Sequence, residues 1–528
     1  MVSQIEHKPA LVRRILMKGR GENKSVLAAL IIGFCGVAGV FIATRTPGAL
    51  GSLEPVLFVA APVLVIAAVR KWERGVQFIL VVVIVEGAVR KWFLPSASEV
   101  VYFYKDVLMA ATLFGYFRKR RKEPFVIKRR VRLVSIAIGL FAFYGLASMG
   151  MPSGPHPLIG LLGLKAYCLY IPLAFLVPRA FPDKERMIGF LKWYSLIVLP
   201  VAVIGVMQFL DTNRQSSLNR YAIEQTPGEA AAIAMFGTAS ENYYVRITGT
   251  FSYVTGLSVY LPIMFALLLA LTSLFSKRSL PRWSRILYYS ALAVTIVLAF
   301  MTGSRGSVLA MAVVALVFYL FTSGRQVVRR LQQIAVVGAI IFVAFTSIFP
   351  QAYDAFYNRT FGGEGRRSEG WSRMTSVLNL PANEASYAGL FGYGIGLTQN
   401  GVPALMRRLG IPEGERMPVE SEGESGRVTL ELGMLGFVLY TLMRLVLLVT
   451  VWRMSMSIRD RESKMLAFAA TAALVVPLVA GGAITTHTLN VYQWFLVGMV
   501  FALYNAERVQ LRKQKQTVPM PAMAACQT

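Results

Sequence analysis

The chain has 528 residues, of which 55% are hydrophobic and 16% are charged, and its net charge is +28. Soluble globular domains carry about a quarter charged residues, so this composition excludes an ordinary soluble protein. Many charge-free windows are about 18 to 22 residues long, which is the length that crosses a bilayer core of about 30 Å. The sequence therefore predicts an all-α polytopic membrane protein.

The positive charge does not indicate a nucleic-acid partner. Lysine and arginine crowd into short loops between apolar runs, and this alone gives a membrane protein a high net charge. The three cysteines and three histidines lack the spacing of a metal site, so we expect neither a metal nor another cofactor.

Fourteen apolar runs are candidate spans, and miscounting one pair of helices would leave twelve. A basic segment, 1–25, precedes the first run, which lacks a convincing cleavage site and therefore predicts an uncleaved span. The candidate spans are 26–43, 53–69, 75–89, 100–117, 132–149, 157–177, 189–210, 250–274, 286–301, 306–322, 332–349, 432–452, 465–482 and 489–505.

The loops predict the orientation of these spans. Basic loops alternate with loops poor in lysine and arginine, and the basic side of a membrane protein is cytoplasmic. With an even number of spans, both termini lie in the cytoplasm. The expected organisation is a cytoplasmic segment at 1–25, helices 1–11 at 26–349 with an outer loop at 211–249, a large outer loop at 350–431, helices 12–14 at 432–505, and a disordered cytoplasmic tail at 506–528.

Several charged residues fall in or next to the third and fourth spans, where a charge costs about 2.5–3.5 kcal/mol on insertion scales. Glu86 and Arg90 are four residues apart and share a helix face, so they can pair. Lys91, Lys105 and Asp106 lie close to them in the sequence. Either these residues form a salt-bridge network that fixes helix packing, or Arg90 and Lys105 bind substrate.

Three outward-facing stretches are rich in arginine and glycine. The first is RITGTF at 246–251, and the second is TGSRG at 302–306, a turn so short that Arg305 must lie at the membrane surface. The third is the large loop, which holds eight arginines, nine carboxylates and no lysine between Pro350 and Leu430. Arginine binds phosphate and carboxylate groups in a fixed geometry, so this composition favours a folded site for an anionic ligand.

Each stretch also has a plain structural interpretation. Arg305 can cap an interfacial turn, FGYGIG at 391–396 can be a tight turn, and the acidic run at 420–424 can be solvated surface. If the loop is a site, its candidate substrate-binding residues are Gly394, Gly396, Glu420, Glu424, Arg427 and Glu431, with Arg90, Lys105 and His487 from other outer segments.

The motifs, taken in order, resemble the O-antigen ligase and O-antigen polymerase (Wzy-type) superfamily of bacterial inner membranes. The resemblance covers about residues 190–500. It is carried by Gln208, R-x-T-G-T-F at 246–251, T-G-S-R-G at 302–306, G-Y-G-I-G at 392–396 and E-L-G-M-L-G at 431–436.

The resemblance implies a GT-C-like fold and a metal-independent, inverting glycosyl transfer on the periplasmic face of the inner membrane. The donor would be a glycan on undecaprenyl pyrophosphate, and Arg246 and Arg305 would be the catalytic residues that hold the pyrophosphate. A polymerase moves this glycan onto the next lipid-linked repeat unit, often with a chain-length regulator as partner. A ligase moves it onto lipid A core.

The acceptor hydroxyl needs a general base. Ligases of the family carry a histidine eleven residues before the first glycine of a G-x-x-G, and counting back from Gly433 leads to Glu422. A carboxylate flanked by Glu420 and Glu424 can still act as the base, because neighbouring negative charges raise its proton affinity. His487 is the second candidate. The absence of the histidine favours a polymerase of O-antigen, capsule or exopolysaccharide.

Two other functions remain open on the sequence alone: ligase-type transfer to another acceptor, and a lipid-linked oligosaccharide flippase or other transporter. A flippase needs cations that line a central cavity, usually between two related halves. This chain shows no such halves and concentrates its polar residues in outer segments, so the sequence favours an enzyme.

Overall fold

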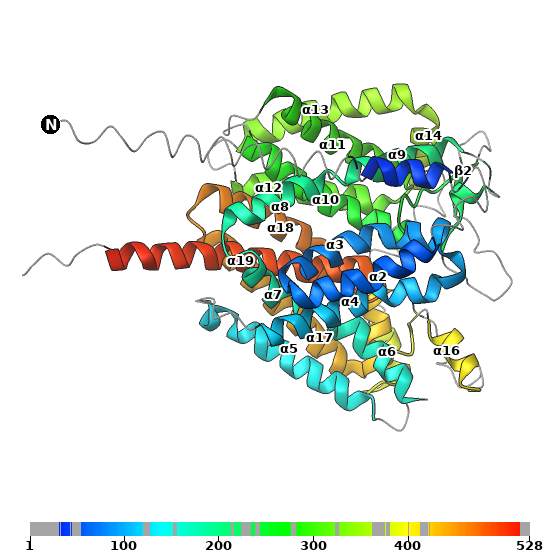
Figure 1. Ribbon diagram of the computed structural model, residues 1–528, viewed down its shortest axis with the longest axis vertical. Helices are drawn as coiled ribbons and strands as arrows, with labels where there is room; N and C mark the ends of the chain where they lie inside the picture. The colour runs from blue at the N-terminus through cyan, green and yellow to red at the C-terminus, as the bar shows by residue number, and fades with distance from the viewer. Residues whose placement is uncertain are drawn as a thin grey trace, which may run out of the picture. The chain divides into compact units, whose positions relative to one another are not determined.

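The structure is a computed structural model, with its elements labelled in Figure 1. It describes residues 31, 33–42, 44, 54–119, 127–150, 156–211, 213, 216–222, 234–237, 243–275, 281–322, 327–361, 375, 381–399, 401–411, 421 and 423–517. The chain divides into two compact units. The first comprises Met1–Ile66, Gln77–Leu108 and Glu185–Trp371, and the second comprises Ala67–Val76, Met109–Lys184 and Ser372–Thr528.

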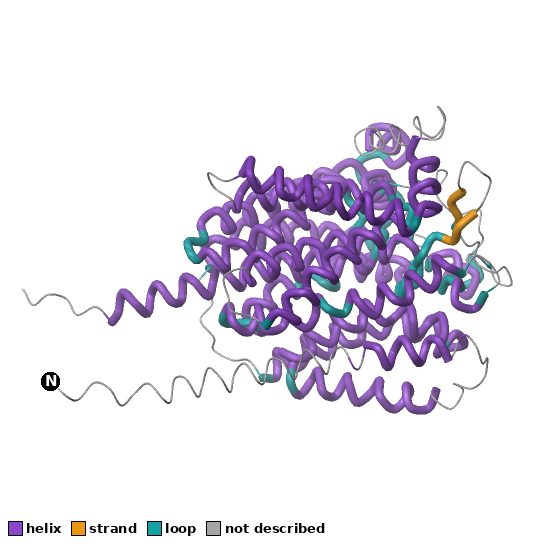
Figure 2. The backbone as a smooth tube through the Cα atoms, turned by 90° about the horizontal axis from the view of Figure 1, so that it is seen from above, coloured by secondary structure: helices purple, strands orange, loops and turns teal. Residues whose placement is uncertain are grey.

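The protein is an all-α multi-pass membrane protein, as the composition predicts. Figure 2 shows helices in purple, and the described residues contain a single strand pair, drawn in orange. Eight described helices are long and apolar enough to cross a bilayer, or nine if one bent pair forms a single span. The total of fourteen spans remains a prediction.

The spanning helices coincide with predicted apolar runs. The eight are Pro95–Arg118, Lys128–Ser148, Lys184–Leu210, Val254–Phe275, Arg282–Met301, Arg305–Thr322, Glu424–Ser457 and Arg461–Ala480. The bent pair is α6 (Pro157–Cys168) with α7 (Leu173–Ala180), which meet at 43°.

The first unit is organised around one buried helix, α10. This helix is apolar on all sides and almost all of its side chains are buried, as expected of a span surrounded by other helices. It packs against α11 and α12, and α11 packs against α9. The bounds are α2 (Glu54–Arg70), α3 (Trp72–Ala88), η2 (Val89–Phe93), η3 (Pro95–Ala97), α4 (Ser98–Arg118), α8 (Lys184–Ser195), α9 (Val198–Leu210), η4 (Ser217–Asn219), α10 (Val254–Phe275), α11 (Arg282–Met301), α12 (Arg305–Thr322), α13 (Val327–Ile348) and α14 (Pro350–Phe361).

The predicted outer loop at 211–249 contains the strand pair. β1 (Met235–Gly237) and β2 (Tyr243–Val245) are antiparallel, with Met235 opposite Val245. Helix α14 packs against both strands, and α9 packs against β2. Arg246, the first arginine of the RITGTF motif, therefore follows directly on a fixed strand.

The second unit is built on the last three helices of the chain. Its bounds are α5 (Lys128–Ser148), α6, α7, a helix at 381–388, α16 (Val402–Arg408), α17 (Glu424–Ser457), α18 (Arg461–Ala480) and α19 (His487–Thr517), with part of α4. Helix α19 packs against α7, α17 and α18, and α17 also packs against α5.

Two helix boundaries differ from those predicted from the sequence. Helix α17 begins at Glu424, before the predicted start at 432, because the polar stretch ESGRVTLE forms a helical segment of its own that meets the apolar segment at a break at Gly433. Helix α19 continues to Thr517, so the tail predicted to be disordered from 506 is helical up to that residue.

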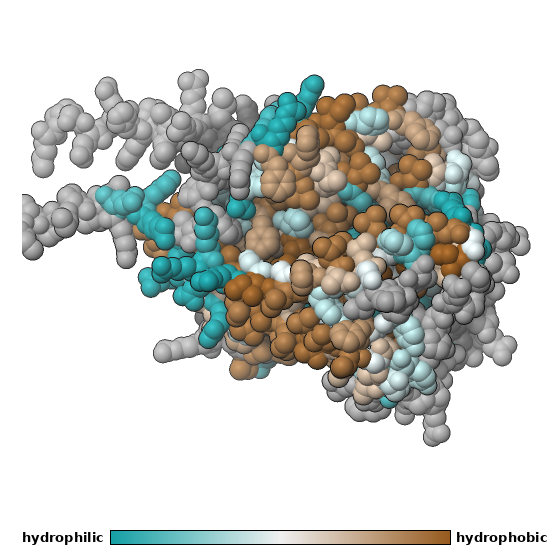
Figure 3. Space-filling view, turned by 90° about the horizontal axis from the view of Figure 1, so that it is seen from below, coloured by the Kyte–Doolittle hydropathy of each residue, from teal (hydrophilic) through white to brown (hydrophobic). Residues whose placement is uncertain are grey.

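Large apolar side chains lie on the surface, as Figure 3 shows in brown for one face. On α5, for example, Leu133, Leu140 and Phe143 are more than half exposed. Soluble proteins rarely expose apolar surface on this scale, whereas the acyl chains of a bilayer match it. The exposed side chains therefore fit a lipid-facing surface.

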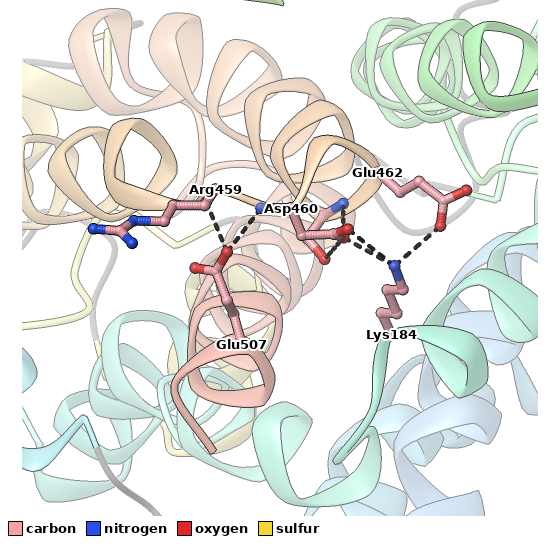
Figure 4. A network of polar contacts seen from close by, with 6 residues as sticks. Lys184, Arg459, Asp460, Glu462 and Glu507 are labelled. Carbon is pink, nitrogen blue, oxygen red and sulfur yellow. Dashed lines mark hydrogen bonds and ion pairs between the residues drawn. The ribbon is translucent and has the colours of Figure 1, made fainter. Parts of the chain in front are cut away.

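A polar network fixes the loop that leads into α18 (Figure 4). Asp460 caps α18, because its carboxylate accepts hydrogen bonds from the backbone N–H of Ser463 at 3.0 Å and from its hydroxyl at 2.7 Å. Lys184 forms ion pairs with Asp460 at 3.0 Å and with Glu462 at 3.2 Å. The cap and the ion pairs together hold the start of α18.

The same loop is tied to α19. The Glu507 carboxylate accepts hydrogen bonds from the backbone N–H groups of Arg459 and Asp460, at 2.7 and 2.8 Å. The carboxylate thus satisfies backbone donors that the turn between α17 and α18 leaves unpaired.

We predict that Asp460→Ala destabilises the folded protein by about 1 kcal/mol at neutral pH, the typical effect of losing an N-cap. Burial alone would raise the pKa of Asp460, but hydrogen bonds from Ser463 and the contact with Lys184 outweigh it and lower the pKa. The stabilisation is therefore complete above the ordinary aspartate pKa of about 4 and is lost as the pH falls through the lower folded value.

Thermal unfolding of the purified protein in detergent between about pH 7 and pH 3 measures this effect. The difference in Tm between wild type and Asp460→Ala should narrow toward the acid end. The exposed carboxylate of Asp354 on α14 provides the control, Asp354→Ala. A difference that stays constant over the whole range contradicts the proposed cap.

Candidate functional site

The two arginine-containing turns of the first unit meet. The Nε of Arg246 donates a hydrogen bond to the carbonyl of Thr302 at 3.0 Å, so RITGTF and TGSRG are in direct contact. The carbonyl of Arg246 also accepts a hydrogen bond from the Tyr221 hydroxyl at 3.0 Å. Gly303 has a φ of 63°, which glycine adopts without strain, and two residues later Arg305 begins α12.

This arrangement suits an anion. The first N–H groups of a helix have no partner within the helix and carry a partial positive charge. Arg305 is half-buried at this end of α12, and the half-buried Arg246 is anchored to the turn that precedes it. Phosphate groups bind helix N-termini that carry nearby guanidinium groups.

The backbone of the RITGTF turn is held by two buried polar side chains. The Oε1 of Gln208, on α9, accepts hydrogen bonds from the N–H groups of Thr248 and Gly249 at 3.0 and 2.8 Å. The Nζ of Lys91 donates to the Thr248 hydroxyl at 2.8 Å and to the Gly249 carbonyl at 2.7 Å. Burial lowers the pKa of Lys91 well below its ordinary value. Gln208 and Lys91 therefore support the turn.

Arg90 and Lys105 belong to a salt-bridge network, which is one of the two interpretations that the sequence allows for these residues. The Glu86 carboxylate lies 2.8 Å from Lys105 and 3.7 Å from Arg90, which confirms the pair predicted from their spacing. Arg90 also donates to the Ser252 hydroxyl at 3.0 Å and to the carbonyl of Ala222 at 2.8 Å. These contacts explain both cations without a ligand.

In the second unit, α17 is broken at Gly433, whose φ of 68° and ψ of −175° belong to a region that is essentially confined to glycine. The turn at 389–394 supplies the missing backbone partners. The hydrogen bonds run from Tyr393 N to Leu430 O at 2.9 Å, from Gly394 N to Glu431 O at 2.9 Å, from Met434 N to Gly389 O at 3.0 Å and from Leu435 N to Leu390 O at 3.2 Å. GYGIG and ELGMLG, which look like separate motifs in the sequence, form one backbone clamp.

The glycines of FGYGIG allow close backbone packing. A side chain on Gly392 would collide with the backbone of Gly433, and one on Gly396 would collide with the carbonyl of Ile159 in α6. Gly394 has a φ of 113°. A tight structural turn, which is the plain interpretation of FGYGIG in the sequence, therefore explains all three glycines.

Glu431 positions Arg427 through Thr398. The buried Glu431 carboxylate accepts from the N–H and the hydroxyl of Thr398, at 2.8 and 2.5 Å, and from the Tyr167 hydroxyl at 2.8 Å. The carbonyl of Thr398 accepts from Arg427 Nη1 at 3.1 Å, and Arg427 Nε donates to the carbonyl of Ser421 at 2.9 Å. These two hydrogen bonds hold the guanidinium of Arg427 in place, and no carboxylate of the described residues forms an ion pair with it.

Glu424 has a structural role in this geometry. Its Oε1 lies 2.7 Å from Arg444 and 3.0 Å from the Tyr440 hydroxyl, and its Oε2 accepts from the N–H groups of Gly482 and Ile484 at 2.8 and 2.7 Å. Both carboxylate oxygens of Glu424 accept hydrogen bonds, and the bonds from Gly482 and Ile484 fix the turn between α18 and α19. His487, which begins α19 after this turn, is half-buried.

Two predicted site residues are not described by the structure, and the contacts of three further residues become clear only from it. Glu420 and Glu422 lie outside the described residues. Lys91 and Gln208 support the RITGTF turn. Lys91 follows the apolar run at 75–89 and Gln208 lies within the run at 189–210, but the sequence does not reveal which loop each one contacts. Glu384, in the segment PANEAS of the large loop, is buried although its surroundings in the sequence are polar and small.

Comparison with known proteins does not identify the family: no protein-family model matches the chain, and neither does any curated protein.

We predict that Gly433→Ala destabilises the second unit. The backbone strain alone costs about 1–3 kcal/mol, and the new methyl group would collide with the carbonyl of Leu390. Gly139→Ala on α5 is the matched control, because nothing lies within 4 Å of its added methyl group. Thermal unfolding should show a lower Tm for Gly433→Ala only. Equal Tm values for the two variants would show that the clamp does not need the break.

Proposed function

We propose that this protein is a glycosyltransferase that polymerises undecaprenyl-pyrophosphate-linked repeat units of a surface polysaccharide. The polysaccharide class is O-antigen, capsule or exopolysaccharide, and the reaction takes place on the periplasmic face of the bacterial inner membrane. The fold would be GT-C-like, with both termini in the cytoplasm and a chain-length regulator as a possible partner. Donor and acceptor are both lipid-linked oligosaccharides.

The observation that carries the proposal is the contact between Arg246 and Thr302 at 3.0 Å. It joins the two motifs that resemble the superfamily and places one arginine beside the turn that leads to the other. The leaving group of the reaction is a lipid pyrophosphate, and fixed positive charges accelerate its departure by stabilising the charge that develops on it. Arg246, Arg305 and the N-terminus of α12 would supply that charge.

The remaining chemistry is removal of a proton. The acceptor oxygen attacks the anomeric carbon from the side opposite the pyrophosphate, which inverts the configuration, and its proton passes to a general base. The resemblance points to Glu422 for this role and to His487 after it. In the second unit, Arg427 donates hydrogen bonds to the carbonyls of Ser421 and Thr398, so its guanidinium is held in place.

Arg246→Ala and Arg305→Ala should each abolish long glycan and leave single repeat units on the lipid carrier. Loss of one fixed cation near a developing charge lowers kcat by about 100- to 1000-fold. The products are measured as lipid-linked glycan ladders from cells that depend on the variant. Arg407→Ala, at the end of α16, controls for the loss of an outer arginine. Long chains from both variants would contradict the pyrophosphate role.

A further inference from the structure

Helix α5 of the second unit carries an exposed apolar stripe that begins with an arginine. Leu133, Ile136, Leu140 and Phe143 are exposed and follow one another at helical spacing, so they lie on one face of the helix. Arg129, which is also exposed, lies one turn before Leu133 and continues this face. The face that matches the acyl chains of a bilayer therefore ends in a guanidinium group.

Helix α17 has the same arrangement in its last turns. Leu442, Leu445 and Val449 are about half exposed and share a face, and the exposed Arg453 follows Val449 on that face after one turn. Arg132, beside the stripe of α5, is also exposed. Among the described residues, no carboxylate forms an ion pair with any of these arginines.

The basic ends of the two helices lie at the same level. The Tyr144 hydroxyl of α5 donates to the carbonyl of Leu432 at 2.7 Å, and the rings of Phe141 and Tyr440 lie 5.3 Å apart, so α5 and α17 run antiparallel. Arg453 lies thirteen residues beyond Tyr440, and α5 begins thirteen residues before Phe141. Because each helix rises about 1.5 Å per residue, Arg453 is level with the first turn of α5.

A phospholipid fits this end of the α5–α17 pair. Its acyl chains match the exposed apolar stripes, and its phosphate group is a preferred partner of guanidinium groups. Three arginines at one level favour a lipid with a net negative charge over a zwitterionic one. This is also the end predicted to be cytoplasmic, and Figure 3 shows hydrophilic surface, in teal, bordering the brown apolar surface.

We propose that the helix ends carrying Arg129, Arg132 and Arg453 bind an anionic phospholipid, with its acyl chains along the exposed stripes. The lipid phosphate joins the first turn of α5 to the last turns of α17, and the hydrogen bond between Tyr144 and Leu432 joins the opposite ends of the two helices. This inference concerns the second unit alone and does not depend on the proposed reaction.

The test measures lipid binding to the purified full-length protein in detergent by native mass spectrometry. The protein is titrated separately with dioleoyl phosphatidylglycerol, which is anionic, and with dioleoyl phosphatidylcholine, which is zwitterionic. Wild type should bind phosphatidylglycerol more tightly. Arg129→Gln, Arg132→Gln and Arg453→Gln should each raise the apparent Kd for this lipid about fivefold, and the triple variant about 100-fold, which is the effect expected of basic residues next to anionic lipid. The Kd for phosphatidylcholine should not change.

Arg461→Gln is the matched control. Arg461 is an exposed arginine at the start of α18, but that helix is buried over most of its length and offers no apolar stripe to a lipid. This variant should bind phosphatidylglycerol as wild type does. Because all four arginines are exposed, the Tm of each variant without added lipid should stay near that of wild type.

Three results would overturn the proposal. Equal affinity of wild type for the two lipids would show that the arginines select no anionic lipid. The same loss in Arg461→Gln, or displacement of the lipid by an equal concentration of inorganic phosphate, would show a general attraction between anions and a basic surface. A dimer that forms in place of the lipid-bound monomer would show that a second copy of the chain covers this face.

Discussion

Backbone N–H and C=O groups that are buried in a protein must find hydrogen-bond partners there, because an unpaired buried group costs free energy. This requirement explains the polar contacts around the irregular turns of both units. Gln208 and Lys91 satisfy the turn at 248–249, the turn at 389–394 satisfies the break in α17, and Glu424 satisfies the turn at 482–484. Irregular backbone is stable at these places only because buried polar side chains or a second backbone segment complete its hydrogen bonds.

The same kind of contact also holds the arginine side chains that the proposed reaction needs. Arg246 and Arg305 belong to turns fixed by such contacts, and Arg427 is fixed by two carbonyls. Rigid groups stabilise a transition state better than mobile ones, because they need no reorganisation when charge develops. In the first unit, the fixed cations suit the leaving pyrophosphate of the proposed reaction. In the second unit, taken by itself, the hydrogen bonds to two carbonyls fix the guanidinium of Arg427.

The sequence predicts the helices well, because a run of apolar residues long enough to span a bilayer has few alternatives. It also predicts the Glu86–Arg90 pair, because residues i and i+4 are neighbours on the surface of any helix. It fails where partners are distant in the chain. The acidic run places Glu424 among candidate ligands, yet its partner Arg444 lies across a helix break that periodicity does not reveal. Glu384 escapes notice because PANEAS has the composition of an ordinary exposed loop.

The central claim is that this membrane protein forms glycosidic bonds from lipid-linked donors. The direct measurement is the incubation of purified wild-type protein with a lipid-linked repeat unit in detergent, where no membrane separates two compartments. A polymerase should produce lipid-linked chains of two or more repeat units and release the lipid pyrophosphate in step. A transporter cannot make this product, so unchanged single repeat units, from a protein that moves the same lipid across vesicle membranes, would contradict the claim.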